Sequence, residues 1–301
     1  MPVTGSPPAG GGRLHERDGR ATLVARSPAP MLRASGHGPI TRIRLARTVA
    51  GRALYSVCAY LVDGVLIDNG PPATARELVA WLRPRPPRLV LNTHYHEDHT
   101  GGNGALQRAF GVRVLAPAAS IARLAAFYRL PFYRALVWGQ PTDVGVEPLP
   151  PVVDTGEYRF EVVPTPGHAP DHVCLFEPEQ GWVFSGDLFI HERVTYTREV
   201  EDVWQHIASL RRVLALQPRL LLCSHAGVVH DPQGAIRSKI AFWEGLAERA
   251  RTLYEQGVPL GAIRSRLLGR EGWMTYISRG DFSKKNMIRA LIKRQAMVDR
   301  R

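Results

Sequence analysis

The stretch that most constrains this chain is residues 91–103, which read LNTHYHEDHTGGN. Within six positions it holds four side chains of the types that bind metals: His94, His96, Asp98 and His99. Side chains alternate in direction along an extended segment, so we expect His94, His96 and Asp98 to point one way and His99 elsewhere, toward a second ion. A lone histidine is more often an ordinary core or surface residue. Three histidines with an aspartate would repel as cations and lack partners if buried neutral, so this cluster predicts a metal site.

The pattern H-x-H-x-D-H followed by Thr-Gly-Gly resembles the signature of the metallo-β-lactamase superfamily. The other metal positions of that superfamily can be matched one at a time. His168 stands in a Thr-Pro-Gly-His turn, Asp187 in Phe-Ser-Gly-Asp, and His225 directly after the apolar run 220–224. Asp68 closes another apolar run and matches the aspartate that supports the ligands from behind. The resemblance covers residues 68–225, just over half of the chain.

The resemblance implies an α/β fold, the four-layer αββα sandwich, with two metal ions at one edge of its two sheets. The first ion would be held by His94, His96 and His168, and Asp187 would bridge the two ions. The second ion would be held by Asp98, His99 and His225. Imidazoles and carboxylates suit two Zn²⁺ ions, with iron or manganese as alternatives.

The chemistry that the resemblance implies is hydrolysis by a hydroxide that bridges the metals, because coordination lowers the pKa of water to about 7. Asp98 would orient this nucleophile as the catalytic residue. Asp68 would fix the tautomer of a ligand histidine without touching a metal. His172, four positions after His168, is interpreted as a similar supporting residue because the ligand set is complete without it.

The sequence differs from the motifs of several branches of the superfamily, and these differences restrict the type of reaction expected. Homoserine-lactone lactonases carry a tyrosine at the position of Ile190, and residues 190–193 differ from the glycine- and cysteine-containing run of glyoxalase II. The Ser-His-Ala-Gly sequence around His225 lacks the H-x-T motif of the tRNA-processing branch. We therefore expect a hydrolase of an ester, thioester or lactone carbonyl. The alternatives are a phosphodiesterase or ribonuclease of the same fold, and a metal- and nucleic-acid-binding module without catalysis.

The pattern of apolar residues predicts three regions. Residues 1–36 are rich in Gly, Pro, Ser and Arg and predict a disordered leader, with Met31 as an alternative start. Residues 37–231 alternate between strand and helix patterns and predict the catalytic domain. Residues 232–301 have helical periodicity only and predict a C-terminal helical appendage similar in pattern to that of glyoxalase II-like hydrolases.

Individual elements follow from periodicity and turn residues. Strands are predicted at residues 40–44, 88–91, 112–116, 158–163, 172–176, 182–185 and 220–223, with a hairpin over 54–67 that turns at Asp63-Gly64. Helices are predicted at residues 71–82, 104–110, 201–216, 233–256, 260–268 and 283–297.

Residues 118–150 predict a helical cap over the metals. This segment is rich in aromatic side chains, of which Tyr128, Tyr133 and Trp138 are candidate substrate contacts. Tyr196, close in sequence to the bridging aspartate, is a fourth. An aromatic lid would suit a small, partly apolar substrate.

The net charge of +12 is concentrated at the two ends of the chain, since residues 48–236 carry a slight negative charge. Solvated arginines explain these ends more simply than a nucleic-acid surface. No run of eighteen apolar residues and no secretory signal are found, and the three cysteines have no C-x-x-C spacing. We therefore expect a cytoplasmic protein without a membrane span, with a homodimer as one possible assembly.

Overall fold

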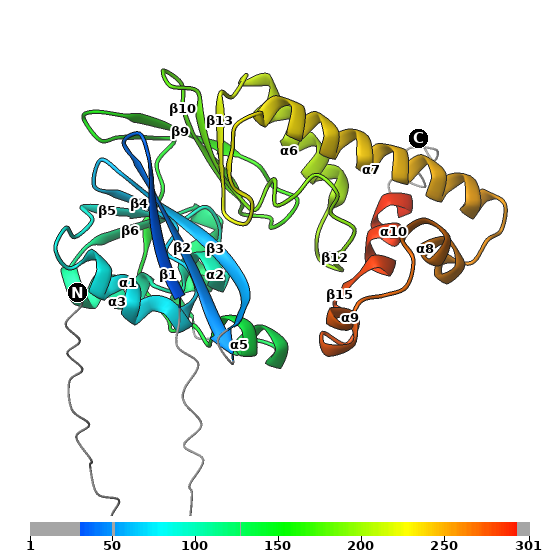
Figure 1. Cartoon of the computed structure of the whole chain (residues 1–301), viewed down its shortest axis with the longest axis horizontal. Helices are drawn as coiled ribbons and strands as arrows, with labels where there is room; N and C mark the ends of the chain where they lie inside the picture. Colours follow the sequence, from blue (N-terminus) through cyan, green and yellow to red (C-terminus); the bar gives the residue numbers. More distant parts are fainter. Residues whose placement is uncertain (1–30, 50–51, 127, 294–301) are drawn as a thin grey trace, which may run out of the picture.

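The computed structural model describes residues 31–49, 52–126 and 128–293. Two sheets face each other and helices cover their outer faces, as Figure 1 shows, so the predicted αββα sandwich is confirmed. Residues 1–30 of the predicted leader lie outside the described residues. The predicted boundary at residue 36 is wrong, because strand β1 (Met31–His37) pairs antiparallel with β2 (Ile40–Val49). β1 is an edge strand in which no residue is fully buried, so it lacks the apolar alternation that identifies a strand in sequence.

The first sheet has the strand order β1-β2-β3-β4-β5-β6-β7. After β1 and β2, its strands are β3 (Arg52–Val62), β4 (Val65–Ile67), β5 (Leu89–Leu91), β6 (Arg113–Ala116) and β7 (Glu147–Pro148). Strands β3 and β4 form the predicted hairpin, and both Asp63 and Gly64 have positive φ at its turn. Strands β4, β5 and β6 are parallel, so their carboxyl ends lie at the same edge.

The second sheet has the order β14-β13-β11-β10-β9-β8. Its strands are β8 (Val152–Asp154), β9 (Arg159–Pro164), β10 (Val173–Glu177), β11 (Trp182–Gly186), β13 (Leu220–Cys223) and β14 (Gly227–Val229). Strand β10 is antiparallel to both β9 and β11, and β13 is parallel to β11. The carboxyl ends of β9, β11 and β13 therefore meet at one edge.

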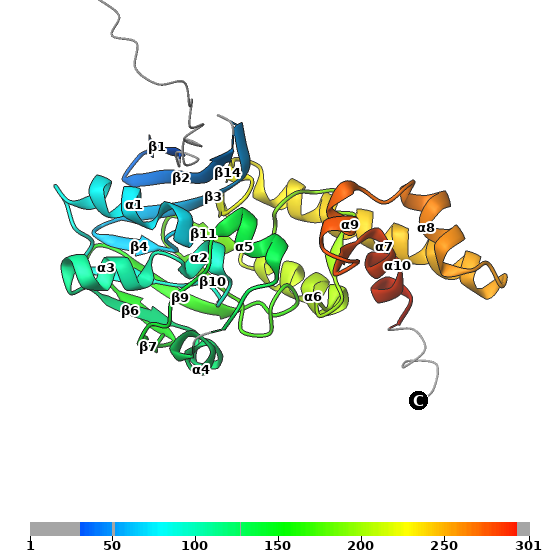
Figure 2. The ribbon, with the colours of Figure 1, turned by 90° about the horizontal axis from the view of Figure 1, so that it is seen from below.

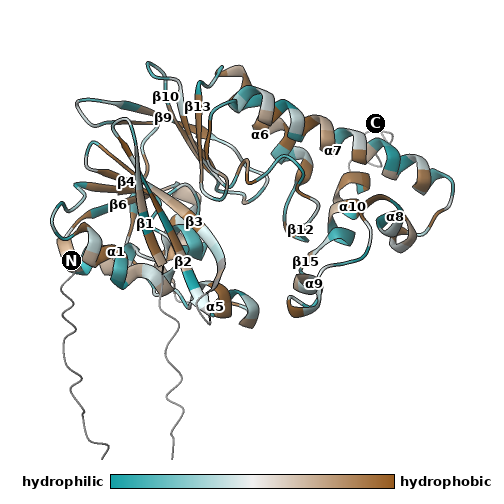
Figure 3. Cartoon of the chain, viewed as in Figure 1, coloured by the Kyte–Doolittle hydropathy of each residue, from teal (hydrophilic) through white to brown (hydrophobic). Residues whose placement is uncertain are grey.

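The core between the sheets is built from their inner faces. Tyr60 of the first sheet packs edge-on against Phe184 of the second, with ring centroids 5.6 Å apart. The Tyr60 hydroxyl donates a hydrogen bond of 2.7 Å to the carbonyl of Cys223, which ties the two sheets together. Figure 3 shows brown, hydrophobic segments along strands of both sheets. Cys58, Cys174 and Cys223 are free and buried.

Helices shield the outer faces. Helices α1 (Ala75–Leu82) and α3 (Asn103–Phe110) cover the first sheet, and the 3-10 turn η1 (Pro72–Thr74) precedes α1. Helix α6 (Val203–Ala215) covers the second sheet, and the Asp202 carboxylate caps it by accepting from two backbone amides.

The predicted helical cap is broken into short pieces. It contains η2 (Ala118–Ser120), α4 (Ile121–Ala125) and α5 (Phe132–Trp138). Arg47 on β2 donates to the carbonyl of Leu136, 2.6 Å away, which holds α5 beside the first sheet.

The C-terminal appendage begins with α7 (Pro232–Glu255), which runs from the sandwich to α8 (Leu260–Leu268) (Figure 1). Helix α10 (Lys284–Lys293) packs against both, and Figure 2 shows this helical group beside the sandwich. The predicted last helix extended to residue 297, beyond the described residues. None of the described helices, including the 24-residue α7, is long and apolar enough to cross a membrane.

Two short elements of the appendage were not predicted. Helix α9 (Trp273–Ile277) precedes β15 (Phe282–Ser283), and β15 pairs antiparallel with β12 (Thr197–Arg198). The pairing brings the appendage back to the edge of the sandwich where the strand ends meet. These elements are only a few residues long, so they have no readable periodicity.

Candidate metal centre

The histidine-rich stretch begins at the carboxyl end of β5. His94 and His96 lie in the loop after this strand, and helix α2 (Glu97–Thr100) carries Asp98 and His99. The expectation that Asp98 points with His94 and His96 is wrong. The chain enters a helical turn at Glu97, which rotates Asp98 away from the preceding histidines and toward the side of His99.

The remaining candidate ligands lie at strand ends of the second sheet. His168 follows β9, Asp187 follows β11, and His225 follows β13. Because these three strands run the same way, their ends converge on the loop after β5. The fold thus brings all seven predicted ligands to one edge of the sandwich.

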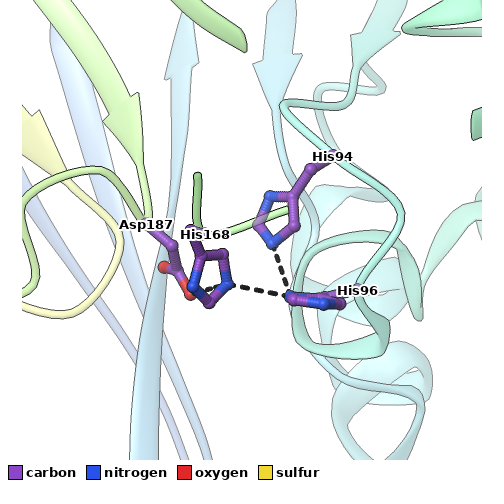
Figure 4. A group of neighbouring side chains, drawn as sticks. All are labelled: His94, His96, His168 and Asp187. Carbon is purple, nitrogen blue, oxygen red and sulfur yellow. Dashed lines mark hydrogen bonds and ion pairs between the residues drawn. The ribbon is translucent and has the colours of Figure 1, made fainter. Parts of the chain in front are cut away.

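The seven side chains form two groups that share Asp187. One group is His94, His96, His168 and Asp187, and the other is Asp98, His99, Asp187 and His225. In each group the ligand atoms lie within 4.8 Å of one another. Figure 4 shows the first group, in which the three imidazoles and the carboxylate face a common point.

The carboxylate of Asp187 stands between the groups. Its Oδ2 lies 3.3 Å from His168 Nε2 in the first group. Its Oδ1 lies 3.3 Å from both His99 Nε2 and His225 Nε2 in the second. One oxygen faces each group, which is the arrangement that a bridging ligand requires.

Hydrogen bonds on the outer side of three rings fix their tautomers. His99 Nδ1 lies 2.8 Å from Asp68 Oδ2, and His225 Nδ1 lies 3.0 Å from the carbonyl of Ser56. Both partners accept only, so each Nδ1 carries the proton and each Nε2 presents a lone pair to the centre. His94 Nδ1 is bonded to Thr93 Oγ1, which already donates to Asp68, so the same assignment follows.

Electrostatics in the first group favours neutral imidazoles. Burial and the surrounding histidines hold the pKa values of His94 and His96 well below the ordinary value. Neutral imidazole is the form that binds metals. His96 Nδ1 lies 2.9 Å from both His94 Nε2 and His168 Nε2, so three ring nitrogens converge.

The carboxylates of the second group favour a positive charge at this position. Burial lowers the pKa of His99, but Asp187 and Asp68 raise it well above the ordinary value, and Asp187 likewise raises that of His225. His99 Nε2 and Asp187 Oδ1 are buried and form no hydrogen bond with any residue that the structure describes. Cations at the two groups would satisfy these atoms, so the residues fit a dinuclear metal centre.

Asp68, which was expected to lie behind the candidate ligands, contacts residues of this centre. Its carboxylate accepts hydrogen bonds from Thr93 and from His99. It therefore contacts the second group directly through His99, and the first group through Thr93, whose hydroxyl is bonded to His94. Its backbone has φ of 54°, a left-handed conformation that few residues other than glycine adopt, at the end of β4. The strained turn places the carboxylate beneath the ligands.

His172 also lies behind the ligands. Its Nδ1 is 2.8 Å from Thr165 Oγ1, and its Nε2 accepts from the backbone amide of Asp187 at 3.1 Å. Burial lowers the pKa of His172 to about 3, which keeps the ring neutral and able to accept. The contact places the backbone of Asp187.

Two supporting residues were missed in the sequence. Glu201 Oε1 lies 3.7 Å from His168 Nδ1, and His168 lowers the pKa of this buried carboxyl although burial raises it. Lys239 of α7 is fully buried and donates to the carbonyls of Leu188 and Phe189, directly after Asp187. Nothing in the spacing of either residue distinguishes it from ordinary surface charges.

The metal centre opens into a pocket of about 520 Å³. His96, Asp98, His168, Asp187 and His225 lie on its floor. Its walls include Tyr133, Val137 and Trp138 from α5, and Met274 and Phe282 from the appendage. The pocket therefore lies between the sandwich, the cap and the appendage.

Two of the four predicted substrate contacts, Tyr133 and Trp138, line this pocket, whereas Tyr128 and Tyr196 do not. The guanidinium of Arg123 lies over the ring of Tyr128, with its central carbon 4.9 Å from the ring centroid. Tyr196 stacks on Phe282 with ring centroids 5.4 Å apart, and it thus supports a pocket wall from behind.

The cap is anchored to the metal loop by an ion pair. Arg134 of α5 donates two hydrogen bonds of 2.6 Å to the two oxygens of Glu97, which is buried next to Asp98. This bidentate geometry is the strong form of an arginine–carboxylate contact.

A profile of the metallo-beta-lactamase superfamily matches residues 54–225. An atrochrysone carboxyl ACP thioesterase of Aspergillus fumigatus is 31% identical over 182 residues, which cover 59% of this chain and 52% of the thioesterase. A hydroxyacylglutathione hydrolase of Erythrobacter litoralis is 29% identical over 152 residues, covering 50% of this chain and 53% of the hydrolase. The chain thus spans about half the length of these curated relatives.

A similar fold is found in a solved structure. The crystal structure of a beta-lactamase domain protein from Burkholderia ambifaria matches with a TM-score of 0.68 and 19% identity, over 92% of this chain and 91% of that one. The profile match extends over more than half of the sequence and ends at His225, the last of the ligands described above. The chain belongs to the metallo-beta-lactamase superfamily.

Proposed function

We propose that this chain is a dinuclear metallohydrolase that cleaves a thioester carbonyl, with two Zn²⁺ ions as its cofactors. The observation that carries the proposal is the position of Asp187, whose two oxygens face two ligand groups at the floor of one pocket. Histidine and aspartate ligands without cysteine leave iron and manganese as alternatives. When bound, a pair of such ions polarises a carbonyl oxygen and lowers the pKa of water.

The chain's own residues would prepare the site for this chemistry. Asp68, Ser56 and Thr93 hold three imidazoles with Nε2 unprotonated toward the centre. Asp98 lines the pocket, and although burial raises its pKa, His99 and His225 lower it overall, so its carboxylate is ionised. We propose that Asp98 orients the attacking water, since an ionised carboxylate accepts a proton or a hydrogen bond from it.

The relatives favour a thioester among the carbonyl substrates considered. One is named as a thioesterase of an acyl carrier protein and the other as a hydrolase of an acylated glutathione. An apolar wall formed by Val137, Trp138, Met274 and Phe282 would accommodate an acyl chain. The pocket volume of about 520 Å³ suits a small molecule.

A substrate panel tests the proposal. Purified protein is stripped with a chelator, reloaded separately with zinc, iron or manganese, and assayed on acyl thioesters of N-acetylcysteamine, a γ-lactone and bis-nitrophenyl phosphate. We expect metal-dependent release of thiol from the thioesters to exceed the other reactions. Faster cleavage of the phosphate diester would instead indicate a phosphodiesterase. Full thioester hydrolysis by metal-free protein would overturn the mechanism.

A further inference from the structure

We propose that Arg198 and His96 form a subsite that binds an anionic group of the substrate beside the scissile carbonyl. The inference rests on the proposed thioesterase function and narrows its substrate to thioesters that carry a carboxylate close to the reacting bond. The carboxylate could belong to the acyl part or to the thiol part of the substrate.

The guanidinium of Arg198 lies at the pocket, and one of its donors has no hydrogen-bond partner among the described residues. Its side chain is 13% exposed and lines the pocket, and its Nε is buried with no hydrogen-bond partner among the described residues. Glu201 Oε1 forms an ion pair with this Nε at 3.8 Å, a distance too long for a hydrogen bond, and Glu201 is shared with His168. A guanidinium has five N–H donors and no acceptor, so a mostly buried one requires acceptors.

The tautomer of His96 adds a second donor at the same place. Arg198 Nη1 lies 3.4 Å from His96 Nε2, while His96 Nδ1 faces His94 and His168. If Nδ1 is the metal ligand, as its position in the first group requires, the ring proton is on Nε2. Two N–H donors then face each other, and an anionic oxygen at the pocket side would accept from both.

The charge balance of the pocket also favours an anion. Its charged lining residues are three acids, Asp98, Asp187 and Glu201, and three arginines, Arg44, Arg134 and Arg198. Arg134 is already paired with Glu97, outside the lining. Two divalent cations at the ligand groups would leave the pocket with excess positive charge, which an anionic substrate offsets.

The backbone holds Arg198 in place. Strand β12 carries it, and Arg198 is directly opposite Phe282 of β15 in the antiparallel pair. The appendage thereby fixes the position of a side chain that lies beside the metal ligands. A guanidinium held on a paired strand loses less entropy on binding than one on a free loop.

Matched acid and amide substrates test the subsite and locate the anion. The first pair is the succinyl and succinamoyl thioesters of N-acetylcysteamine, with the charge on the acyl part. The second pair is the butyryl thioesters of 3-mercaptopropionate and 3-mercaptopropionamide, with the charge on the thiol part. We expect the wild type to prefer the acid of one pair by about 10- to 100-fold in kcat/KM, the range for a charged hydrogen bond.

Two variants of Arg198 and one control variant test whether this side chain causes the preference for the acid substrate. Arg198→Gln should lower the ratio of kcat/KM for the acid to kcat/KM for its amide to about one, and Arg198→Lys should retain part of the wild-type ratio. Arg289→Gln removes a neighbouring arginine that pairs with Glu199 at the surface, and it should behave like the wild type. Equal loss on acids and amides, or no acid preference in either pair, would overturn the subsite.

A binding measurement separates this inference from the proposed function. If no thioester in the panel is cleaved, the thioesterase proposal fails, and calorimetry of metal-loaded protein still tests the subsite with two acid and amide pairs. These are succinate with succinamate for the acyl part, and 3-mercaptopropionate with 3-mercaptopropionamide for the thiol part. Tighter binding of the acid of either pair that Arg198→Gln reduces about tenfold would support the subsite. Equal affinity of acid and amide in both pairs would refute it.

Discussion

The hydroxyl of Tyr133 donates a hydrogen bond of 2.5 Å to Asp281 Oδ2 and so joins the cap to the appendage. Tyr133 lies on α5 and lines the pocket, and Asp281 directly precedes β15. Burial, together with this hydrogen bond, raises the pKa of Tyr133, so its hydroxyl stays protonated and continues to donate. The contact connects two walls of the pocket that are far apart in the sequence.

Tyr133→Phe should therefore loosen the pocket more than it destabilises the fold. We expect a loss of about 1 kcal/mol in the free energy of unfolding, the usual value of one hydrogen bond, and a higher KM with a smaller change in kcat. Urea unfolding and steady-state kinetics measure the two effects. Tyr254→Phe, at an exposed tyrosine, is the control. An unchanged KM would mean that the contact does not shape the pocket.

The support that Asp68 gives to both ligand groups leads to a second prediction. Asp68→Asn leaves the side chain nearly the same size but weakens its hold on His99 and on Thr93. We expect metal affinity or activity to fall by about 10- to 100-fold, as is usual when a residue that orients a ligand is changed. Asp63→Asn is a matched control, because Asp63 also has positive φ but lies at the distant hairpin turn. Equal effects of the two substitutions would mean that the loss comes from a change in the left-handed backbone and not from the contacts of Asp68 with His99 and Thr93.

The metal stoichiometry tests the bridging position of Asp187. Wild-type protein should hold about two metal equivalents, since a pair of ions is what this chemistry uses. Asp187→Asn weakens a ligand of both groups, so metal content by mass spectrometry and the stabilisation by added metal should both decrease. Asp231→Asn serves as control. Asp231 is the N-cap of α7, and an asparagine caps a helix as well as an aspartate does. Two tightly held equivalents in Asp187→Asn would exclude the bridging role.

The convergence of the candidate ligands could be predicted from the sequence because their positions depend on local rules. His168, Asp187 and His225 each follow a segment that was predicted as a strand and belongs to one sheet, and parallel strands end at one edge. The direction of Asp98 could not be predicted from alternation alone. It depends on a helical turn that begins one residue earlier, in a segment too short to have periodicity.

The supporting residues could not be predicted because they depend on packing between distant elements. Arg198 lies at the pocket on β12, which pairs with β15 of the appendage. Glu201 faces His168 because the segment before α6 folds back against the turn after β9, where Asp202 N donates to the carbonyl of Gly167. Tyr128, an aromatic residue of the cap like Tyr133, instead packs against Arg123, and composition does not distinguish the two environments.

The buried Lys239 gives a prediction about pH. Its Nζ donates to the carbonyl of Leu188 at 3.0 Å and lies 4.5 Å from the centroid of the Trp243 ring. Burial lowers its pKa from 10.5 to about 7. Between these two values the unfolded chain binds a proton that the folded chain does not. This residue therefore makes the free energy of unfolding rise with pH, by up to about 1.4 kcal/mol per pH unit.

Lys239→Met removes this titrating group from a buried site while keeping a long side chain. The difference in stability between wild type and variant should widen in favour of the wild type from about pH 7 toward pH 10, since only the wild type has this titration. Urea unfolding at a series of pH values measures it. Lys285→Met, at an exposed lysine of α10, should show a constant difference. A constant difference for Lys239→Met as well would mean that Lys239 keeps its charge in the folded chain, stabilised by the two carbonyls and by Trp243.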